Sequence, residues 1–184
     1  MRKVAREDVV DWQTYEEERP AFRARAMAEK SRRRVHVGER LTFLFENALT
    51  TRYQVQEMVR AERIVKEREI RHELDTYNAL LGGPGDLPAT LLIEIDDPEE
   101  RRILLRDWLP PPGHLFVRME DGTKVRALFD PGQVGEGKLS SVQYLRFPVG
   151  GRAPVAVGSD MRGLFKETEF TPDQRRALAE DLAE

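Results

Sequence analysis

A change in hydrophobic periodicity at residues 82–85 restricts the fold of this chain more than any other sequence feature. This Gly-Gly-Pro-Gly stretch ends a helical pattern, because glycine adopts the left-handed conformation that follows a helix and proline cannot continue one. Before it, apolar residues recur at helical spacing; after it, apolar and polar residues alternate as in strands. We therefore expect an α+β fold: an N-terminal helical half, then a mainly antiparallel β-sheet with a C-terminal helix.

A long central helix is predicted over about residues 51–81. Thr51 and Gln54 form a capping-box pattern, in which a Thr hydroxyl and a Gln amide satisfy backbone donors at a helix start. One side of this helix is apolar and consists of Val55, Met58, Val59 and Val65. The segments 1–81 and 86–184 are expected to form one compact domain, because 184 residues are enough for a single core.

Glu62 lies in the middle of that apolar side, where a carboxylate has to be paired or functional because burying an isolated charge is costly. As a structural residue it would pair with an arginine, namely Arg23, Arg33 or Arg34. As a functional residue it would be a metal ligand or a general base in a small-ligand enzyme. We favour the ion pair and assign no catalytic residue. The candidate buried polar site consists of Glu46, Asn47, Gln54 and Glu62.

The opposite side of the predicted helix carries a mixed apolar and charged face. This candidate partner face consists of Tyr53, Glu57, Arg60 and Ile64. Glu57 and Arg60 are three residues apart, a spacing that supports an ion pair on a solvated surface. Tyr53 and Ile64 add the apolar component that a subunit or partner interface requires. We therefore expect this face to form the interface of a homo-oligomer; the alternative is that it is simply exposed to solvent.

Glu69, His72 and Glu73 are the weak candidates for metal ligands. The Glu-x-x-His spacing places both side chains on one helix face, as in carboxylate-bridged di-iron bundles. Those bundles need a second such motif, which this sequence lacks. We therefore predict no metal and no cofactor.

Two helical pieces are expected in residues 1–34, with Pro20 in the first turn of the second piece. The run Arg32 to Arg34 resembles a nucleic-acid-binding patch, but arginines at a solvated helix end are the simpler explanation. Residues 41–47 fit a strand or a helix, and we favour a strand because aromatic residues alternate in it.

Strands, turns and helices follow one another in the second half of the chain. We predict strands over 89–95, 114–120 and 123–130, with Asp121-Gly122 as a hairpin turn, and a second hairpin of 140–149 and 152–157 across Gly150-Gly151. A helix is expected from Asp97-Pro98 to Trp108, and another from Thr171 to Leu182 with Gln174 completing its capping box. The stretches 110–113 and 132–137 are predicted to be a stiff connector and a loop.

Composition excludes several classes of function. The chain has no cysteine, so thiolate metal sites, cysteine-ligated clusters and cysteine nucleophiles are excluded. A net charge of −3 weighs against a general nucleic-acid or anionic-membrane binder. There is no run of about 18 apolar residues and no signal-like start, so we expect a soluble cytoplasmic protein.

The order of several motifs resembles an uncharacterised bacterial family that is defined only as a domain of unknown function. The resemblance lies in Arg33-Arg34-Val35-x-Val37-Gly38, Phe45-Glu46-Asn47, Tyr53-Gln54-Val55-Gln56-Glu57-Met58, Glu73-Leu74-x-x-Tyr77-Asn78 and Ala89-Thr90-Leu91-x-Ile93-Glu94. Genes of this family often lie beside those for rubrerythrin and iron–sulfur oxidoreductases. The resemblance therefore implies a redox or oxidative-stress context. Together with the absence of a complete catalytic set and the mixed helix face, it leads us to expect a non-catalytic accessory or interaction protein that acts with a redox partner.

Overall fold

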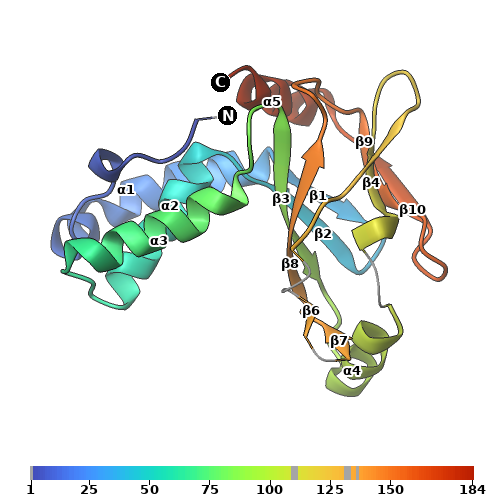
Figure 1. Ribbon diagram of the computed structural model, residues 1–184, viewed down its shortest axis with the longest axis horizontal. Coiled ribbons are helices and arrows are strands. Elements are labelled where there is room, and N and C mark those ends of the chain that lie inside the picture. Colours follow the sequence, from blue (N-terminus) through green and yellow to red (C-terminus); the bar gives the residue numbers. More distant parts are fainter. Residues whose placement is uncertain (1, 109–111, 131–133, 136) are drawn as a thin grey trace.

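The chain forms an α+β fold in which a layer of three helices lies beside two antiparallel sheets (Figure 1). The computed structural model describes residues 2–108, 112–130, 134–135 and 137–184. The predicted fold class is confirmed. The predicted connector over 110–113 and the loop over 132–137 lie partly outside the described residues.

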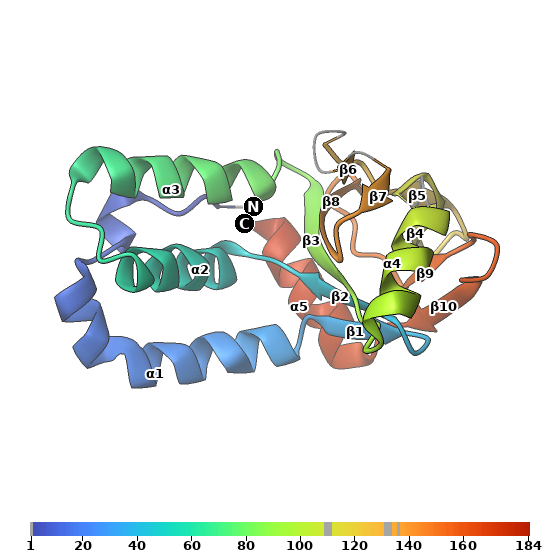
Figure 2. The same ribbon diagram turned by 90° about the horizontal axis from the view of Figure 1, so that it is seen from below.

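The helical layer consists of α1 (Trp12–Ser31), α2 (Ala48–Ala61) and α3 (Glu67–Leu80), which run side by side (Figure 2). Asp11 caps α1 by accepting hydrogen bonds from the backbone N–H groups of Gln13 and Thr14. The two separate pieces predicted here are wrong, because α1 continues through Pro20. The missing N–H of Pro20 costs α1 one internal hydrogen bond, while its buried side chains Tyr15, Phe22 and Ala26 keep it packed on α2.

The predicted central helix is in fact the two helices α2 and α3. The chain turns at Arg63, whose φ of 50° is in the left-handed region and ends α2. This turn lets Ile64 enter an apolar cluster with Val59 of α2 and Ile70 of α3. A straight helix could not bring these three residues together, so tertiary packing decides where the helix ends.

The start of α2 also differs from the prediction. Asn47, not Thr51, is the N-cap, and it exchanges hydrogen bonds with Thr50 as a capping box. Thr51 is buried within the first turn of the helix.

Sheet A and sheet B each have four described strands and are antiparallel throughout. Sheet A has the order β1 (Arg34–Val37), β2 (Leu41–Phe45), β3 (Asp86–Ile93) and β8 (Val142–Pro148). Sheet B has the order β10 (Lys166–Glu169), β9 (Ala156–Ser159), β4 (Leu115–Arg118) and β5 (Lys124–Arg126). A small hairpin joins β6 (Val134–Gly135) and β7 (Lys138–Leu139). Because β2 and β3 are neighbours, the α2–α3 pair is an insertion between two adjacent strands.

Several local predictions for the second half are confirmed. Residues 41–45 form a strand, and Asp121-Gly122 joins β4 and β5. Asp97 caps α4 (Pro98–Asp107), and Thr171 with Gln174 caps α5 (Pro172–Ala183). Two short 3-10 turns are η1 (Arg6–Asp8) and η2 (Pro112–His114).

The hairpin predicted across Gly150-Gly151 is wrong. The strand before it, β8, belongs to sheet A, and the strand after it, β9, belongs to sheet B. Gly150 and Gly151 have φ values of 62° and 75°, which turn the chain from one sheet to the other instead of back on itself.

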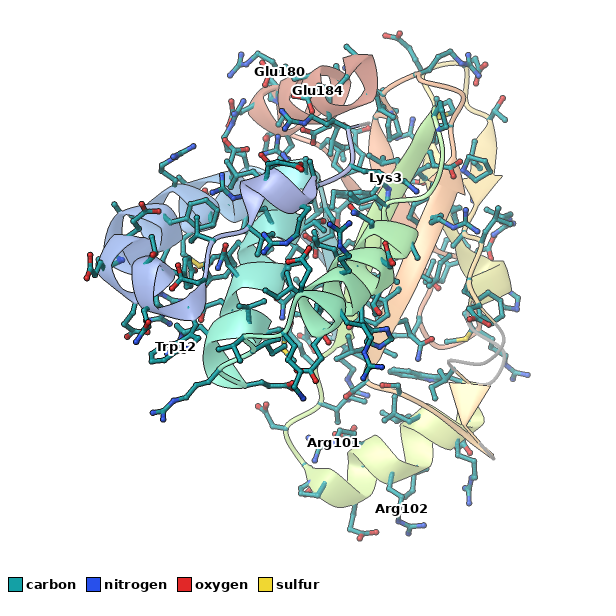
Figure 3. The ribbon with its side chains drawn as sticks, turned by 60° about the vertical axis from the view of Figure 1, so that its left-hand side comes forward. Lys3, Trp12, Arg101, Arg102, Glu180 and Glu184 are labelled. Carbon is teal, nitrogen blue, oxygen red and sulfur yellow. The ribbon has the colours of Figure 1, made fainter. Side chains whose placement is uncertain are left out.

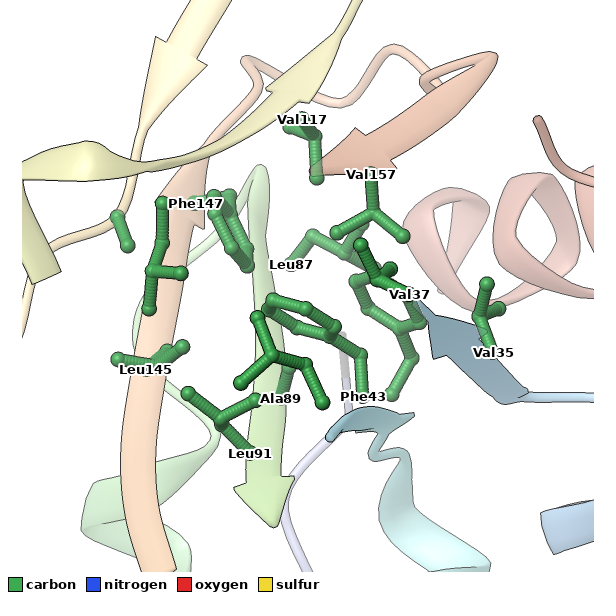
Figure 4. Packing of buried hydrophobic residues seen from close by; sticks show 14 of the residues in the cluster. Val35, Val37, Phe43, Leu87, Ala89, Leu91, Val117, Leu145, Phe147 and Val157 are labelled. Carbon is green, nitrogen blue, oxygen red and sulfur yellow. The ribbon is translucent and has the colours of Figure 1, made fainter. Parts of the chain in front are cut away.

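The main core lies between the two sheets (Figure 4). Val37, Phe43 and Leu91 point into it from sheet A, and Val117 and Val157 meet them from sheet B. Leu178 of α5 closes one end of this core.

Candidate functional site

A cleft of about 310 Å³ opens between the helical layer and the outer face of sheet A. We call it the interlayer cleft. Its walls come from α2, α3, β2, β3 and β8, with Lys30 at the end of α1 and Arg34 in β1.

Strand alternation explains why polar and apolar groups of sheet A face this cleft. Phe43, Phe45 and Leu91 point into the core, so their neighbours along β2 and β3 point outward. The cross-strand pairs of the outer face that line the cleft are Leu44↔Thr90, Thr90↔Tyr144 and Leu92↔Val142. The floor of the cleft is therefore largely apolar.

Two pairs of polar side chains line the cleft. Thr90 Oγ1 donates to Glu46 Oε1 at 2.8 Å and so holds the carboxylate just before the N-cap of α2. Tyr77 of α3 and Gln54 of α2 form the second pair; burial raises the pKa of the Tyr77 phenol, and the interaction with the Gln54 side chain opposes this effect. The cleft thus contains a carboxylate, an amide and a phenol that keep capacity for further hydrogen bonds.

Charges in the cleft are not paired with one another. Within the part of the chain that the structure describes, Glu46 and Arg34 make no ion pair, although most of the described arginines do. The Nζ atom of Lys30 lies 5.2 Å from the centre of the Tyr53 ring. Two cations and one carboxylate are therefore available to a ligand.

A second hollow, of about 340 Å³, lies where α1 ends and α2 begins, beside the end of α5. Arg33, only 2% exposed, donates from Nε and one terminal nitrogen to the two Asp181 oxygens at 2.7 and 2.8 Å. Asn47 Nδ2 donates to the same carboxylate at 3.0 Å. Burial opposes the charge of Arg33, but the bonds to Asp181 outweigh it and raise the pKa of the guanidinium. We assign this cluster a structural role, because the Arg33 guanidinium and the Asp181 carboxylate already bind each other.

The predicted buried polar site is divided by the structure. Glu46 and Gln54 both line the interlayer cleft, whereas Asn47 belongs to the Arg33–Asp181 cluster. The expected burial of Glu62 is wrong: it is exposed and forms the C-cap of α2. The prediction assumed an uninterrupted helix, whereas α2 ends before Glu62 and the chain turns at Arg63, so Glu62 lies at an exposed helix end.

Two of the three arginines proposed as partners of Glu62 bind elsewhere, and the third, Arg34, lines the interlayer cleft. Arg23 donates to the Tyr53 hydroxyl at 2.5 Å, and Arg33 binds Asp181. Arg32, in the run considered for nucleic acid, pairs with Asp173 and Glu180 of α5.

The candidate partner face is covered by this chain itself. Tyr53 and Ile64 are 5% and 7% exposed, so the expectation that they form an exposed surface is wrong. Glu57 accepts hydrogen bonds from Tyr15 and Arg19 of α1, both at 2.8 Å, and Arg60 is paired with Glu16 of α1 at 3.4 Å. Tyr53, Glu57 and Arg60 thus pack against α1, whereas Ile64 packs with Val59 and Ile70, so the mixed character reflects packing within the chain.

The weak metal candidates lie on α3 but do not converge. Glu69 is paired with Lys66 at 3.1 Å. Among the described residues there is no group of three His, Asp or Glu side chains that could hold a metal ion. In that same part of the chain, no helix has the length and apolar character needed to cross a membrane.

Sequence analysis missed Lys30, Tyr77, Thr90 and Tyr144 as cleft residues. The outward positions of β3 and β8 could have indicated Thr90 and Tyr144, because β8 alternates strictly between buried and exposed residues. No local pattern indicates that α3 lies over this face.

Comparison with known proteins places the chain among proteins whose role is undefined. A crystal structure of a novel protein of unknown function from Burkholderia pseudomallei K96243 is similar, with a TM-score of 0.89 and 31% identity over 98% of this chain and 100% of that chain. The comparison with curated proteins gave no match. Residues 3–182 match the family model described as protein of unknown function (DUF3501). The chain therefore belongs to the DUF3501 family, as the resemblance to a domain of unknown function implied.

Proposed function

We propose that this protein is a binding protein and that the interlayer cleft takes a small organic anion with an apolar part. The observation that supports this proposal is that Arg34 and Glu46, which make no ion pair with any described residue, line a cleft with a largely apolar floor. Small-ligand sites typically combine a mostly apolar lining with a few polar groups that fix orientation.

Each part of the cleft matches a part of such a ligand. Arg34 and Lys30 would bind the anionic group, because a guanidinium forms strong charge-assisted hydrogen bonds with carboxylates and phosphates. Leu92 and Val142 would contact the apolar part. Glu46 would accept a hydrogen bond from a ligand N–H or O–H group, and this preference would select among anions.

The test is calorimetric titration with benzoate and phenyl phosphate, with benzyl alcohol as the uncharged comparison. We expect saturable binding of an anion and weaker binding of the alcohol. Arg34→Gln should weaken anion binding by about tenfold or more, because a hydrogen bond to a charged group contributes about 1.5–3 kcal/mol. Arg162→Gln, at an exposed position between β9 and β10, is the matched control. Absence of saturable binding, or equal binding by both variants, would contradict the proposal.

We further propose an accessory role in a redox or oxidative-stress context, with a homo-oligomeric form and a redox protein as partner. The support is the family resemblance and the neighbouring genes that it implies. The alternative predicted from the sequence is an enzyme centred on a buried Glu62, but Glu62 is exposed. Of that alternative we keep only the small-ligand site, which we assign to the cleft lined by Glu46 and Gln54. Co-purification from the native host tests the accessory role; recovery of neither a redox partner nor a self-associated form would count against it.

A further inference from the structure

The leading segment, which we define as residues 2–10, lies along α2 and α3 on the outside of the helical layer (Figures 2 and 3). Lys3 lies close to the sheets, while Trp12, where α1 begins, lies at the far end of the layer. Apart from the 3-10 turn η1 (Arg6–Asp8), the segment has no secondary structure of its own. It is held by the side chains of the helices beneath it.

Two amide side chains each bind both backbone groups of one residue in this segment. Asn78 Oδ1 accepts from the Val4 N–H and Asn78 Nδ2 donates to the Val4 carbonyl, both at 2.9 Å. Gln56 Oε1 accepts from the Val10 N–H at 2.8 Å, and Gln56 Nε2 donates to the Val10 carbonyl at 3.1 Å. These bonds recognise an extended backbone whatever its side chains are.

Side chains of the segment add selectivity to these backbone contacts. Val4 and Val9 are buried in one apolar cluster with residues of α2 and α3, namely Val55, Val59, Ile70 and Leu74. Arg6 Nε donates to both carboxylate oxygens of Glu67, at 2.9 and 3.1 Å. Backbone hydrogen bonds combined with side-chain pockets are how proteins recognise extended peptides.

The connection to α1 permits the segment to leave without loss of that helix. Asp11 caps α1 through its own side chain, and this cap includes no atom of the segment. Release would expose the apolar cluster on α2 and α3, which then needs another cover. The leading segment of a second copy has the same sequence and would restore every contact.

We propose that the surface of α2 and α3 is a peptide-binding site and that it takes the leading segment of a second copy of this chain. Reciprocal exchange gives a closed two-fold dimer, in which each copy regains the two backbone clamps, the two valine contacts and the Arg6–Glu67 pair. This site is distinct from the interlayer cleft and does not depend on a ligand there.

Chemical cross-linking tests the exchange cleanly, because the chain has no cysteine. A tagged Arg6→Cys protein is mixed with an untagged Glu67→Cys protein and treated with a short bis-maleimide. We expect a covalent heterodimer in several-fold higher yield than from Arg6→Cys mixed with Arg102→Cys, whose cysteine lies on the distant helix α4. The Arg6→Cys/Glu67→Cys double variant confirms that the linker spans the pair within one chain.

Two results would overturn the proposal. The first is a heterodimer yield equal to that of the Arg102→Cys mixture, when the double variant cross-links efficiently. The second is an unchanged yield after Asn78→Ala is added to the Glu67→Cys protein, since that substitution removes one backbone clamp. A several-fold lower yield in this variant, with an unchanged circular dichroism spectrum, supports the clamp.

Discussion

Replacing Asp181 by alanine should destabilise the protein more than any surface substitution. This change removes the carboxylate that binds the buried Arg33 twice and leaves Glu29, which is partly exposed, as the remaining carboxylate on that guanidinium. It also removes the acceptor of Asn47 Nδ2. Breaking a buried ion pair by removing one partner costs about 3–5 kcal/mol. In a domain of this size each 1 kcal/mol lowers Tm by roughly 2–4 °C, so we expect a fall of about 6–20 °C.

The assay is urea unfolding followed by far-UV circular dichroism, with thermal unfolding as a second measurement. Glu180→Ala is the matched control, because Glu180 precedes Asp181 on α5 and pairs with Arg32 at 3.5 Å while remaining 57% exposed. An exposed pair of this kind contributes about 0–1 kcal/mol.

A difference between the two variants of less than about 1 kcal/mol would refute the reasoning, because the buried pair would then behave as a surface pair does. A double-mutant cycle separates the contact from the cost of an uncompensated charge. Arg33→Met combined with Asp181→Leu should lose less stability than the sum of the single changes, since neither Arg33 nor Asp181 then stays buried without the other.

Three further substitutions test other parts of the structure. Burial raises the pKa of Glu57, but hydrogen bonds from Arg19 and Tyr15 outweigh burial and hold this pKa below 4.5. The ionised carboxylate therefore stabilises the fold above pH 4.5, and this stabilisation is lost as the pH falls through the lower pKa of the folded state. Glu57→Gln should thus be less stable than wild type at pH 7, and the difference in unfolding free energy should shrink at pH 3. Gly158→Ala would place a Cβ 2.6 Å from the Lys166 carbonyl oxygen and should lose about 1–3 kcal/mol in urea unfolding; a neutral effect would show that β10 moves freely. Glu62→Gln should change unfolding free energy by less than about 0.5 kcal/mol, and a large loss would restore the buried ion pair predicted from the sequence.

Local chemistry determined the elements that could be predicted from the sequence. The Thr171–Gln174 capping box and the Asp121-Gly122 turn act within four residues, so their sequence alone specifies the structure. The alternation of Phe43 and Phe45 likewise identified β2, because alternate residues of a strand point to the same side, and both rings lie in the main core.

Tertiary packing determined what the sequence could not predict. Arg63 has no glycine-like character, and it adopts a left-handed conformation because Ile64 gains burial next to Val59 and Ile70. Val55 and Val59 stay buried as predicted, but Glu62 and Val65, expected on the same apolar side, are exposed at and beyond the end of α2. The interlayer cleft is lined by both Lys30 and Tyr144, which are separated by more than half the length of the chain. Hydrophobic periodicity describes single helices and strands, so it cannot predict that such distant residues line one cleft.

The insertion of α2 and α3 between the adjacent strands β2 and β3 has a consequence for the order of folding. Without helices, pairing Phe45 with Ala89 requires a long flexible loop to close, and this closure costs conformational entropy. The α2–α3 pair is made of contacts close in sequence, which form quickly. Once formed, it holds the end of β2 near the start of β3, so an early helical hairpin becomes the template on which sheet A assembles.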